Sequence, residues 1–569
     1  FPPLNSGIDA VSRRKILFNI RAAFGGISFA AAFLLAAVLG LRPLFLLAVT
    51  TFFIDLLLEA AFLLLRLPFR KSALRPLVLL AGRRLYELAV LPYSALRDAD
   101  AVCRALYRMI FSHRNMLQWQ TAADAERSRP QNTREYFKAL FPCAAFGTIV
   151  LAAAVSAAIA AARQIHNGET AGMAAAGLAT AVLWLCAPLI AEKKDKKPDP
   201  YRFTAAERGR LTEIFADTWQ YFEQNCTEKT SWLPPDNFQE EPYRGAAMLT
   251  SPTNIGMGLM AVVSAHDMHL LDERGMFTRL ERMVNSIEKL EKWHGHPFNW
   301  YNLRDLSLLR PRFISTVDSG NLFACLITTA CALAECAGQA EKTSAEFAEE
   351  LKKLAARCTA IARAMDFSVL YDNTRELFHI GCSFEEGKLT PSHYDLLASE
   401  CRLTSFSAIA FSRIGSEHWF ALSRLMCDAS GGRVLKSWSG TMFEYLMPLI
   451  FFETVPYSMQ FEVCRNAVLT QILAAAAEKP WGVSESGYYA FDDALRYQYR
   501  AFGNPELALA PGRMRSDVIA PYACVLALAV EPKAAAENLR LLCQIGAAGK
   551  YGLYEALDYG AAERMDLQL

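Results

Sequence analysis

Long runs of apolar residues set the first two hundred positions apart from the rest of the chain. Four such runs occur, at 22–41, 44–65, 141–162 and 171–191. Each has about the 20 residues that a helix needs to cross a bilayer. Buried helices of soluble proteins are seldom so long and so free of charge. The pattern therefore predicts a transmembrane region, residues 1–198, with four membrane-spanning helices.

From Thr204 onward the pattern changes to apolar residues at helical spacing. Stretches such as 211–222, 277–293 and 344–365 follow this period, whereas alternating β-branched runs are nearly absent. Helices joined by polar, Gly- and Pro-bearing loops over residues 199–569 predict an all-α domain, most naturally a toroid of paired helices. Because the helices are not near-copies at a fixed period, a TPR or HEAT solenoid is disfavoured.

Composition agrees with a chain that is partly embedded in a membrane. The 569 residues are too many for one domain, 53% of them are hydrophobic, and the mean hydropathy is +0.14. A net charge of +1 offers no basic footprint for nucleic acid. The fourteen cysteines show no zinc-ligand spacing. We therefore expect buried free thiols in a reducing compartment.

Basic residues give the expected membrane orientation. The loop 66–139 carries fourteen Lys and Arg, and basic clusters at 13–15 and 192–197 flank the set of spans. The two short links between spans hold only one arginine each and one histidine. By the positive-inside rule, both termini and the long loop are cytoplasmic. The pattern predicts a multi-pass protein of the inner (cytoplasmic) membrane with its helical domain inside the cell, and a cleaved signal peptide is a poor alternative.

Two carboxylates, Asp55 and Glu59, lie one helical turn apart within the second predicted span. Carboxylates in a membrane usually face a bundle interior or a wet cavity. One interpretation is a polar path through the membrane. The other is that this end lies near the cytoplasmic interface, where Glu59 reaches water or a nearby arginine.

Seven loops of the helical domain mix Trp, Tyr or Phe with Asn, Asp, Glu, Gln or His. Sugars present apolar faces that stack on aromatic rings and hydroxyls that need amide and carboxylate partners, so this mixture favours a carbohydrate groove. The alternative is a set of capping loops, in which residues such as Ser319 or Thr250 satisfy helix N-termini. The loops are 231–242, 250–258, 294–302, 315–322, 438–448, 481–489 and 551–559.

Metal and nucleophile chemistry is less well supported. His266 and His269 have helical spacing, and His294 and His296 flank a glycine, but no third ligand accompanies either pair. We interpret these as core or surface histidines and expect no metal and no cofactor. A Gly-x-Ser-x-Gly elbow is absent from the sequence.

Carboxylates are the remaining chemistry. Glu485 lies among Trp481, Tyr488 and Tyr489, where poor solvation would keep it protonated near neutral pH, as a general acid for a glycosidic oxygen requires. The alternative is a buried ion pair with Arg402 or Arg496. Other candidates in apolar or aromatic context, and acidic helpers, are Glu400, Glu444, Glu555, Asp236, Asp318 and Asp395.

Eight long motifs occur in an order that resembles a known family. They are WLPPDNFQE, TSPTNIGMGLM, LERMVNSIEKLEKWHGHPFNWYNLRDL, FISTVDSGNL, YDLLASECRLTSFSAIA, GTMFEYLMP, PWGVSESGYYAFD and KYGLYEALDY. Together they resemble the middle, cyclising domain of the cyclic β-1,2-glucan synthases, a relative of the β-1,2-glucanases. The upstream segment RNMLQWQTAADAER is similar to the cytoplasmic segment between membrane helices in that family. The resemblance extends from about residue 66 to the end of the chain.

The resemblance implies an (α/α) six-hairpin barrel of the glucoamylase and β-1,2-glucanase kind. It implies retaining transglycosylation of linear β-1,2-glucan to cyclic β-1,2-glucan through a glycosyl-enzyme, with Glu400 in LLASE as nucleophile and Glu485 in WGVSES as acid/base. Two carboxyls roughly 5–5.5 Å apart suit this chemistry. The residues expected to bind the glucan are Trp232, Asp236, Asn237, Gln239, Asn254, Trp300, Asp318, Asn321, Asp395, Glu444, Tyr488 and Glu555.

Two other functions stay open from the sequence: an endo-β-1,2-glucanase that hydrolyses the polymer, and a non-catalytic glucan-binding membrane module. Membrane spans disfavour the hydrolase, and the presence of both glutamates disfavours the idle module. The chain has no initial methionine and stops before the His-rich helix expected after YEALDY. We therefore expect a segment of a longer polypeptide, its barrel lacking a last helix. Its expected partners are β-1,2-glucan, the lipid bilayer, and covalently linked glycosyltransferase and phosphorylase-like domains.

Overall fold

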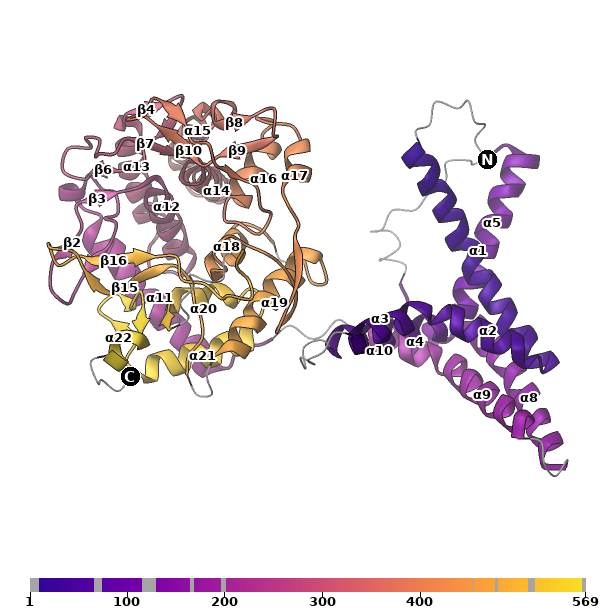
Figure 1. The fold of residues 1–569 in the computed structure, drawn as a ribbon. Coiled ribbons are helices and arrows are strands. Elements are labelled where there is room, and N and C mark those ends of the chain that lie inside the picture. Colours follow the sequence, from indigo (N-terminus) through magenta and orange to yellow (C-terminus); the bar gives the residue numbers. More distant parts are fainter. Residues whose placement is uncertain are drawn as a thin grey trace. The chain divides into compact units, whose positions relative to one another are not determined.

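The computed structural model describes residues 10–65, 74–114, 129–163, 168–195, 201–453, 455–475, 479–509 and 517–564. The chain divides into two compact units, residues 1–200 and 201–569, drawn in Figure 1. Parts of the predicted basic loop, most of the motif at 114–127, and residues 196–200 of the predicted linker lie outside the described residues.

The described part of the first unit is almost entirely helical. Its long apolar sequences leave few alternatives, because every backbone group is satisfied within a helix. The helices are α1 (Ala10–Leu39), α2 (Arg42–Phe52), α3 (Ile54–Leu65), α4 (Leu74–Ala89), α5 (Leu91–Tyr107), the π-helical turn η2 (Arg108–Ser112), α7 (Thr133–Ala139), α8 (Phe141–Arg163), α9 (Gly168–Leu185) and α10 (Ala187–Asp195).

The four predicted spans fall on two continuous helices and two bent pairs. The runs 22–41 and 141–162 lie on α1 and α8. The run 44–65 is divided between α2 and α3, which bend by 58°, and 171–191 between α9 and α10, which bend by 47°. Phe53 and Cys186 fall at the breaks. By length and composition, α14 of the second unit also passes as a span, but 67% of its apolar window is buried.

Polar contacts join the helices of the first unit. The Arg84 Nε on α4 donates to Asp55 Oδ1 on α3 at 2.9 Å, so the arginine contact expected at this turn falls on Asp55. The Trp184 indole N–H donates to the carbonyl of Leu88 at 2.8 Å, and its ring is fully buried. A buried indole usually needs such a partner.

Helices also dominate the second unit, and the predicted helical stretches are confirmed. Each amphipathic run coincides with a helix whose apolar face is buried. The helices are α11 (Ala205–Asn225), α12 (Pro252–Asp267), α13 (Glu273–Lys289), α14 (Thr316–Ala340), α15 (Ala345–Ala364), α16 (Arg402–Ala410), α17 (Glu417–Ala421), α18 (Met442–Leu446), α19 (Met459–Ala474), α20 (Pro521–Ala527), α21 (Pro532–Gln544) and α22 (Tyr559–Arg564).

The helices of this unit pack in pairs. Helix α12 packs against α13 and α14, and α14 packs against α15 and α16. In the second half, α18 packs against α19 and α20, and α20 packs against α21. Figure 1 shows α13, α15, α19 and α21 toward the periphery of the unit, with α12, α14 and α18 nearer its middle. Paired helices of this kind are what the predicted toroid requires, while the six-hairpin barrel itself stays a prediction.

Short antiparallel strands modify the all-α prediction. They have two to six residues and form hairpins and small sheets in the loops between helices. The strands are β1 (Phe238–Gln239), β2 (Gly245–Ala246), β3 (Leu249–Thr250), β4 (Lys292–Trp293), β5 (His296–Pro297), β6 (Tyr301–Asn302), β7 (Phe313–Ser315), β8 (Tyr371–Asp372), β9 (Leu377–His379), β10 (Gly381–Ser383), β11 (Lys388–Leu389), β12 (His393–Tyr394), β13 (Met426–Ala429), β14 (Gly432–Leu435), β15 (Ser486–Phe491), β16 (Tyr497–Arg500), β17 (Val518–Ile519), β18 (Ala548–Gly549), β19 (Gly552–Leu553) and β20 (Leu557–Asp558).

Two apolar cores stabilise the second unit. The first spans residues 219–408 and includes Ile255, Leu322 and Phe367, each fully or almost fully buried. The other spans 397–547 and includes Tyr445 and Leu539. The segment 397–408 contributes to both cores, so the loop that carries Glu400 is anchored on either side.

Candidate active site

Glu400 lies one residue before Cys401, the N-cap of α16, in the loop that follows β12. The α16 amide of Leu403 donates to the Glu400 carbonyl at 3.1 Å, which fixes the backbone here. Burial raises the pKa of the Glu400 carboxyl well above its usual range, and the charges of Glu485, Asp318 and Glu444 raise it further. These four carboxyls are therefore electrostatic neighbours, although they come from distant parts of the chain.

Glu485 immediately precedes β15. Burial, and then the charge of Glu444, raise its pKa to about 7, while a hydrogen bond from Tyr499 acts in the opposite direction. The Tyr522 hydroxyl donates to the Glu485 carbonyl at 2.9 Å, and it also lies 2.9 Å from the Ser484 hydroxyl. The backbone of the glutamate is thus held by a side chain from α20.

The arginines that the sequence offered as ion-pair partners of Glu485 have other contacts. Arg402 is buried and donates to the carbonyls of Leu397, at 3.4 Å, and Tyr445, at 3.0 Å. The Nε of Arg496 lies 4.0 Å from a carboxylate oxygen of Asp492. Burial is therefore the main influence on the pKa of Glu485, and neither arginine forms an ion pair that would offset it.

Glu400 and Glu485 are both harder to ionise than ordinary glutamates. Each has a raised pKa, and the Glu485 charge is among the causes for Glu400. Protons leave such a pair in two steps that belong to both groups, because ionising the second carboxyl beside the first is costly. The charge state of one carboxyl therefore affects the ionisation of the other.

Polar groups at the start of α14 extend the cluster. Asp318 accepts a 2.6 Å hydrogen bond from the Thr253 hydroxyl, and Thr253 accepts one from the Asn321 amide at 3.1 Å. Burial raises the pKa of the Asp318 carboxyl. The Oδ1 atoms of Asn321 and Asp395 are buried and accept no hydrogen bond. Buried acceptors normally have a partner, so these two oxygens lack a contact that is usual in a protein interior.

A second group of predicted residues lies beside Glu555. The Asn254 amide donates to one Asp236 oxygen at 2.8 Å and the Asn237 amide to the other at 3.0 Å. Glu555 accepts a 2.8 Å hydrogen bond from the N–H of Gly487, two residues after Glu485. The charge of Asp236 contributes to a raised pKa of Glu555, after burial. This polar group is therefore connected to Glu485 through the backbone of β15.

Glu444 has an internal role that its sequence context did not indicate. It closes the capping box of α18 with Thr441. Its two oxygens accept from the N–H groups of Trp438, Ser439 and Thr441 at 2.9–3.2 Å and from the hydroxyls of Ser437 and Thr441 at 3.0 and 3.1 Å. Glu444 thus organises the loop 437–444, and we assign its effect on the cluster to its charge.

Two other predicted glucan ligands are also engaged within the protein. Both amide hydrogens of Gln239 are donated, to the carbonyls of Pro242 and Leu495, each at 2.8 Å. The Trp232 ring stacks on the Arg282 guanidinium of α13 at 4.1 Å. Gln239 therefore joins the β1–β2 hairpin to the turn between β15 and β16, and Trp232 has a cation on one face.

Tyr488 and Trp300, the other two aromatic residues predicted to bind glucan, differ in their surroundings. Tyr488 packs edge-on against Phe502 at 5.4 Å between ring centroids, beside a small core that includes Val518. Trp300 is half-buried directly before β6. Tyr488 therefore contributes to packing, at least on one ring face.

Sequence reasoning missed three tyrosines at the carboxylate cluster. Burial raises the pKa of Tyr394, and the charges of Glu400 and Glu485 contribute. Tyr499 and Tyr522 likewise have raised pKa values, through burial and the charge of Glu485. Tyr394 belongs to a quoted motif and could have been included, whereas nothing in the local sequence marks Tyr499 and Tyr522.

The capping alternative for the loops is correct in kind but wrong in its residues. Ser251 caps α12 by accepting from Asn254 N–H at 3.2 Å, and Ser315 caps α14 by accepting from Asp318 N–H at 3.2 Å. Thr250 and Ser319, the predicted caps, have buried hydroxyls without a partner. The loops therefore serve both as caps and as carriers of polar groups.

The histidines weighed from the sequence have ordinary surroundings. His266 lies 3.4 Å from Asp267 at the end of α12. His296 is fully buried against Phe367, with 4.9 Å between ring centroids, and burial lowers its pKa to about 4. It is a core histidine.

The second unit has the fold of glucoamylase-like and β-1,2-glucanase structures. A putative glucoamylase from Bacteroides fragilis superposes with a TM-score of 0.50, at 19% identity over 64% of this chain and 88% of that one. An endo-β-1,2-glucanase from Talaromyces funiculosus, solved with sophorose, gives a TM-score of 0.50 at 12% identity over 63% and 81%. A putative glucoamylase family model matches residues 392–565, and one for a protein of unknown function (DUF3131) matches 214–321.

The predicted resemblance to the cyclic β-1,2-glucan synthases is confirmed. The chain is 31% identical to the cyclic β-(1,2)-glucan synthase NdvB of Rhizobium meliloti (strain 1021) over an alignment of 592 positions, which covers 83% of this chain. It spans about a fifth of that relative's length, 20%.

Proposed function

We propose that the second unit is a glycoside hydrolase-type transglycosylase that converts linear β-1,2-glucan to cyclic β-1,2-glucan with retention. The observation that carries this proposal is that Glu485, 85 positions along the chain from Glu400, lies close enough for its charge to raise the pKa of the Glu400 carboxyl. The similarity to a cyclic glucan synthase and the fold of a glucanase solved with sophorose support the choice of polymer. An (α/α) six-hairpin barrel is the architecture that the proposal implies.

In this mechanism Glu485 protonates the glycosidic oxygen that leaves, while Glu400 attacks the anomeric carbon and forms a glucosyl ester. Glu485, now ionised, removes the proton from the 2-hydroxyl of the chain's own non-reducing end. That hydroxyl displaces Glu400 and closes the ring. A pKa of about 7 suits both tasks, because an acid/base catalyst works best near the operating pH.

The proposal requires the proton of the pair to reside on Glu485 when glucan is bound. Positive charge that develops at the anomeric carbon next to Glu400 would stabilise the Glu400 carboxylate. The hydroxyls of Tyr394 and Tyr499 offer further hydrogen bonds at the pair. Asn321, Asp395, Asp318 and the group around Asp236 and Glu555 are proposed to bind sugar hydroxyls.

Cyclisation instead of hydrolysis is a matter of positioning. The acceptor end must be held near the glucosyl ester while water is excluded. An endo-β-1,2-glucanase is the second candidate, because such an enzyme shares the fold. A non-catalytic glucan-binding module is the third, and the paired carboxyls argue against it.

For the first unit we propose insertion in the inner (cytoplasmic) membrane, with the second unit on the cytoplasmic side. The apolar helix α1, the apolar helix α8 and the two bent pairs supply four spans. Basic residues on the segment between α3 and α8, which includes α4, α5 and α7, support this orientation. Since the chain spans a fifth of its relative, we propose that glycosyltransferase and phosphorylase-like domains are linked to it.

Product analysis separates the three functions. The detergent-solubilised chain is incubated with linear β-1,2-glucan, and the products are examined by mass spectrometry and reducing-end assay. Products that have no reducing end, and that are lighter by one water than linear chains with the same number of glucose units, support the transglycosylase. New reducing ends identify a hydrolase, and unchanged polymer that nevertheless binds to the chain identifies the binding module.

A further inference from the structure

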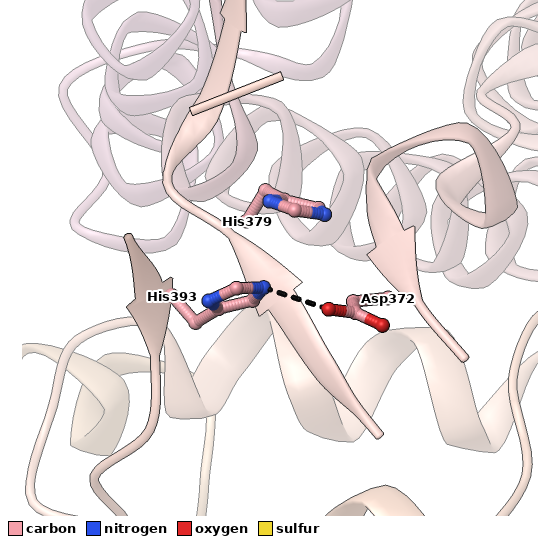
Figure 2. Close-up of side chains that lie close together, drawn as sticks. All are labelled: Asp372, His379 and His393. Atoms are coloured by element: carbon pink, nitrogen blue, oxygen red, sulfur yellow. Dashed lines mark hydrogen bonds and ion pairs between the residues drawn. The ribbon is translucent and has the colours of Figure 1, made fainter. Parts of the chain in front are cut away.

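Three side chains outside the carboxylate cluster converge in the small sheet β12–β9–β8. They are Asp372, His379 and His393, and one potential ligand atom from each lies within 4.8 Å of the others. Figure 2 shows the two imidazole rings side by side, with a nitrogen of each turned toward the side of the Asp372 carboxylate. Within the described ranges this is the single group of three such residues.

Sheet register, which sequence spacing does not reveal, brings the histidines together. His393 on β12 pairs directly with His379 on β9, and their ring centroids are 4.3 Å apart. Directly paired residues on neighbouring strands point to the same face. Asp372 is on β8, the other neighbour of β9. The sequence prediction of no metal overlooked this set, because the three residues lie 7 and 14 positions apart.

Hydrogen bonds to other atoms orient two of these side chains. The Nδ1 of His379 lies 2.6 Å from the carbonyl of Thr390, so Nδ1 carries the proton and Nε2 keeps its lone pair. Asp372 Oδ1 accepts from the N–H groups of Thr374 and Arg375 at 2.8 and 3.2 Å. The other oxygen, Oδ2, is left to face His393. Metal-binding imidazoles and carboxylates are typically oriented by such outer contacts.

The separation of His393 and Asp372 suits a small divalent ion, and the His379 ligand atom lies within 4.8 Å of both. His393 Nε2 lies 3.2 Å from Asp372 Oδ2. Two ligands of a tetrahedral zinc ion at roughly 2.0–2.1 Å from the metal are about 3.3 Å apart. An ion would replace the proton now shared by this pair. The Arg375 Nε, 4.0 Å from Oδ2, is the competing cation, but its side chain is 67% exposed and free to turn into solvent.

We propose that Asp372, His379 and His393 form a binding site for a divalent transition-metal ion, with zinc as the best fit. Two imidazole nitrogens and one carboxylate oxygen are borderline ligands that suit zinc better than magnesium or calcium. The ion would join the three strands of the sheet and leave one position for water. Because Tyr394 follows His393 and leads to Glu400, the site would also stiffen the segment 393–400.

The test uses the full chain, stripped of metal with a chelator, and ZnCl2 as the probe in competition with a chromophoric indicator. We expect one tight zinc ion per chain and a higher unfolding temperature when zinc is present. Asp372→Asn, which keeps an oxygen for the turn N–H groups, and His393→Gln should each weaken binding more than about tenfold. His266→Gln, at a histidine–aspartate contact elsewhere, should bind zinc as the original chain does.

Cobalt distinguishes this site from adventitious binding to the free cysteines. Co²⁺ bound by nitrogen and oxygen gives visible d–d absorption without a sulfur-to-cobalt charge-transfer band, whereas thiolate ligands add that band. A Co²⁺ spectrum with d–d bands and no charge-transfer band supports the proposal if it is lost in Asp372→Asn and kept in His266→Gln. A thiolate spectrum, or equal zinc affinity in all four proteins, would overturn it.

Discussion

Gly320 on α14 lies so close to Thr404 on α16 that a Cβ at this glycine would be 1.9 Å from the Thr404 hydroxyl oxygen. Asp318 precedes Gly320 by two residues, and Glu400 precedes Thr404 by four. The distance between these two carboxyls is therefore set by a helix contact that tolerates only glycine at this point.

Gly320→Ala is expected to destabilise the chain by about 1–3 kcal/mol, because the helices must separate to admit the methyl group. Turnover of β-1,2-glucan should fall as well, as Asp318 and Glu400 move apart. Gly338→Ala, on the same helix with nothing within 4 Å, is the matched control and should be stabilising by up to about 1 kcal/mol. Denaturant unfolding of both variants measures the difference, and equal stabilities would contradict the close contact.

Replacing Glu485 by Gln should make the fold more stable at alkaline pH. The pKa of Glu485 is about 7 in the folded chain and 4.5 by the reference value, so folding opposes its ionisation. Below pH 4.5 the raised pKa does not affect the free energy of unfolding, because the carboxyl is protonated in both states. Between pH 4.5 and 7 it lowers the free energy of unfolding increasingly, and above pH 7 this loss is constant. The variant should gain up to about 3 kcal/mol at pH 8, less what solvent screens, and nothing near pH 4.

Unfolding curves at several pH values measure this gain. The exposed variant Glu386→Gln, at a surface pair 3.2 Å from Lys388, should show little change at any pH. A constant difference between Glu485→Gln and the original chain from pH 4 to 8 would mean that Glu485 has an ordinary pKa.

Tyr499→Phe should shift the pH dependence of turnover. The Tyr499 hydrogen bond lowers the pKa of Glu485, so its loss should raise that pKa further, by up to about one unit. If Glu485 is the acid, the alkaline limb of the kcat/KM profile moves to higher pH. Tyr497→Phe is the matched control, because Tyr497 on the same strand donates to the Glu241 carbonyl at 2.7 Å instead. An unshifted Tyr499→Phe profile would separate Tyr499 from the catalytic acid.

Glu444→Gln should reduce stability more than an ordinary cap variant. The amide nitrogen would replace an oxygen that accepts from backbone N–H groups, at a cost of about 1–3 kcal/mol. Glu207 closes a similar capping box at the exposed start of α11, and Glu207→Gln should cost less. If Glu444→Gln loses no more unfolding free energy than Glu207→Gln does, the capping role of Glu444 is contradicted and glucan binding becomes its better explanation.

Much of the helical content and part of the site could be predicted from the sequence, for different reasons. Helical periodicity is a repeated signal, so the stretches that became α11, α13 and α15 were identified. A strand of two or three residues is too short to show an alternating apolar pattern, so the sequence did not predict the hairpins. Glu400 and Glu485 stood out because each is an acid in an apolar or aromatic segment.

Other features depend on contacts that no local pattern contains. Gln239 and Glu444 appeared free to bind a sugar until their carbonyl and N–H partners came into view. Tyr522 reaches Glu485 from 37 positions away, and His379 meets His393 only through sheet register. The bend between α9 and α10 lies at Cys186, two residues before Pro188, so this proline could have indicated it, whereas no proline lies in the run 44–65 to mark the bend between α2 and α3.

The assignment of roles within the glutamate pair is tested most directly by chemical rescue. Glu485→Gln and Glu400→Gln should each lose turnover of the natural glucan by several orders of magnitude. With a β-glucosyl substrate that has an activated leaving group, azide should restore activity to Glu485→Gln alone, because that leaving group needs no proton and azide needs no base. The account predicts a glucosyl azide of β configuration. An α-configured product, or rescue of Glu400→Gln alone, would contradict it.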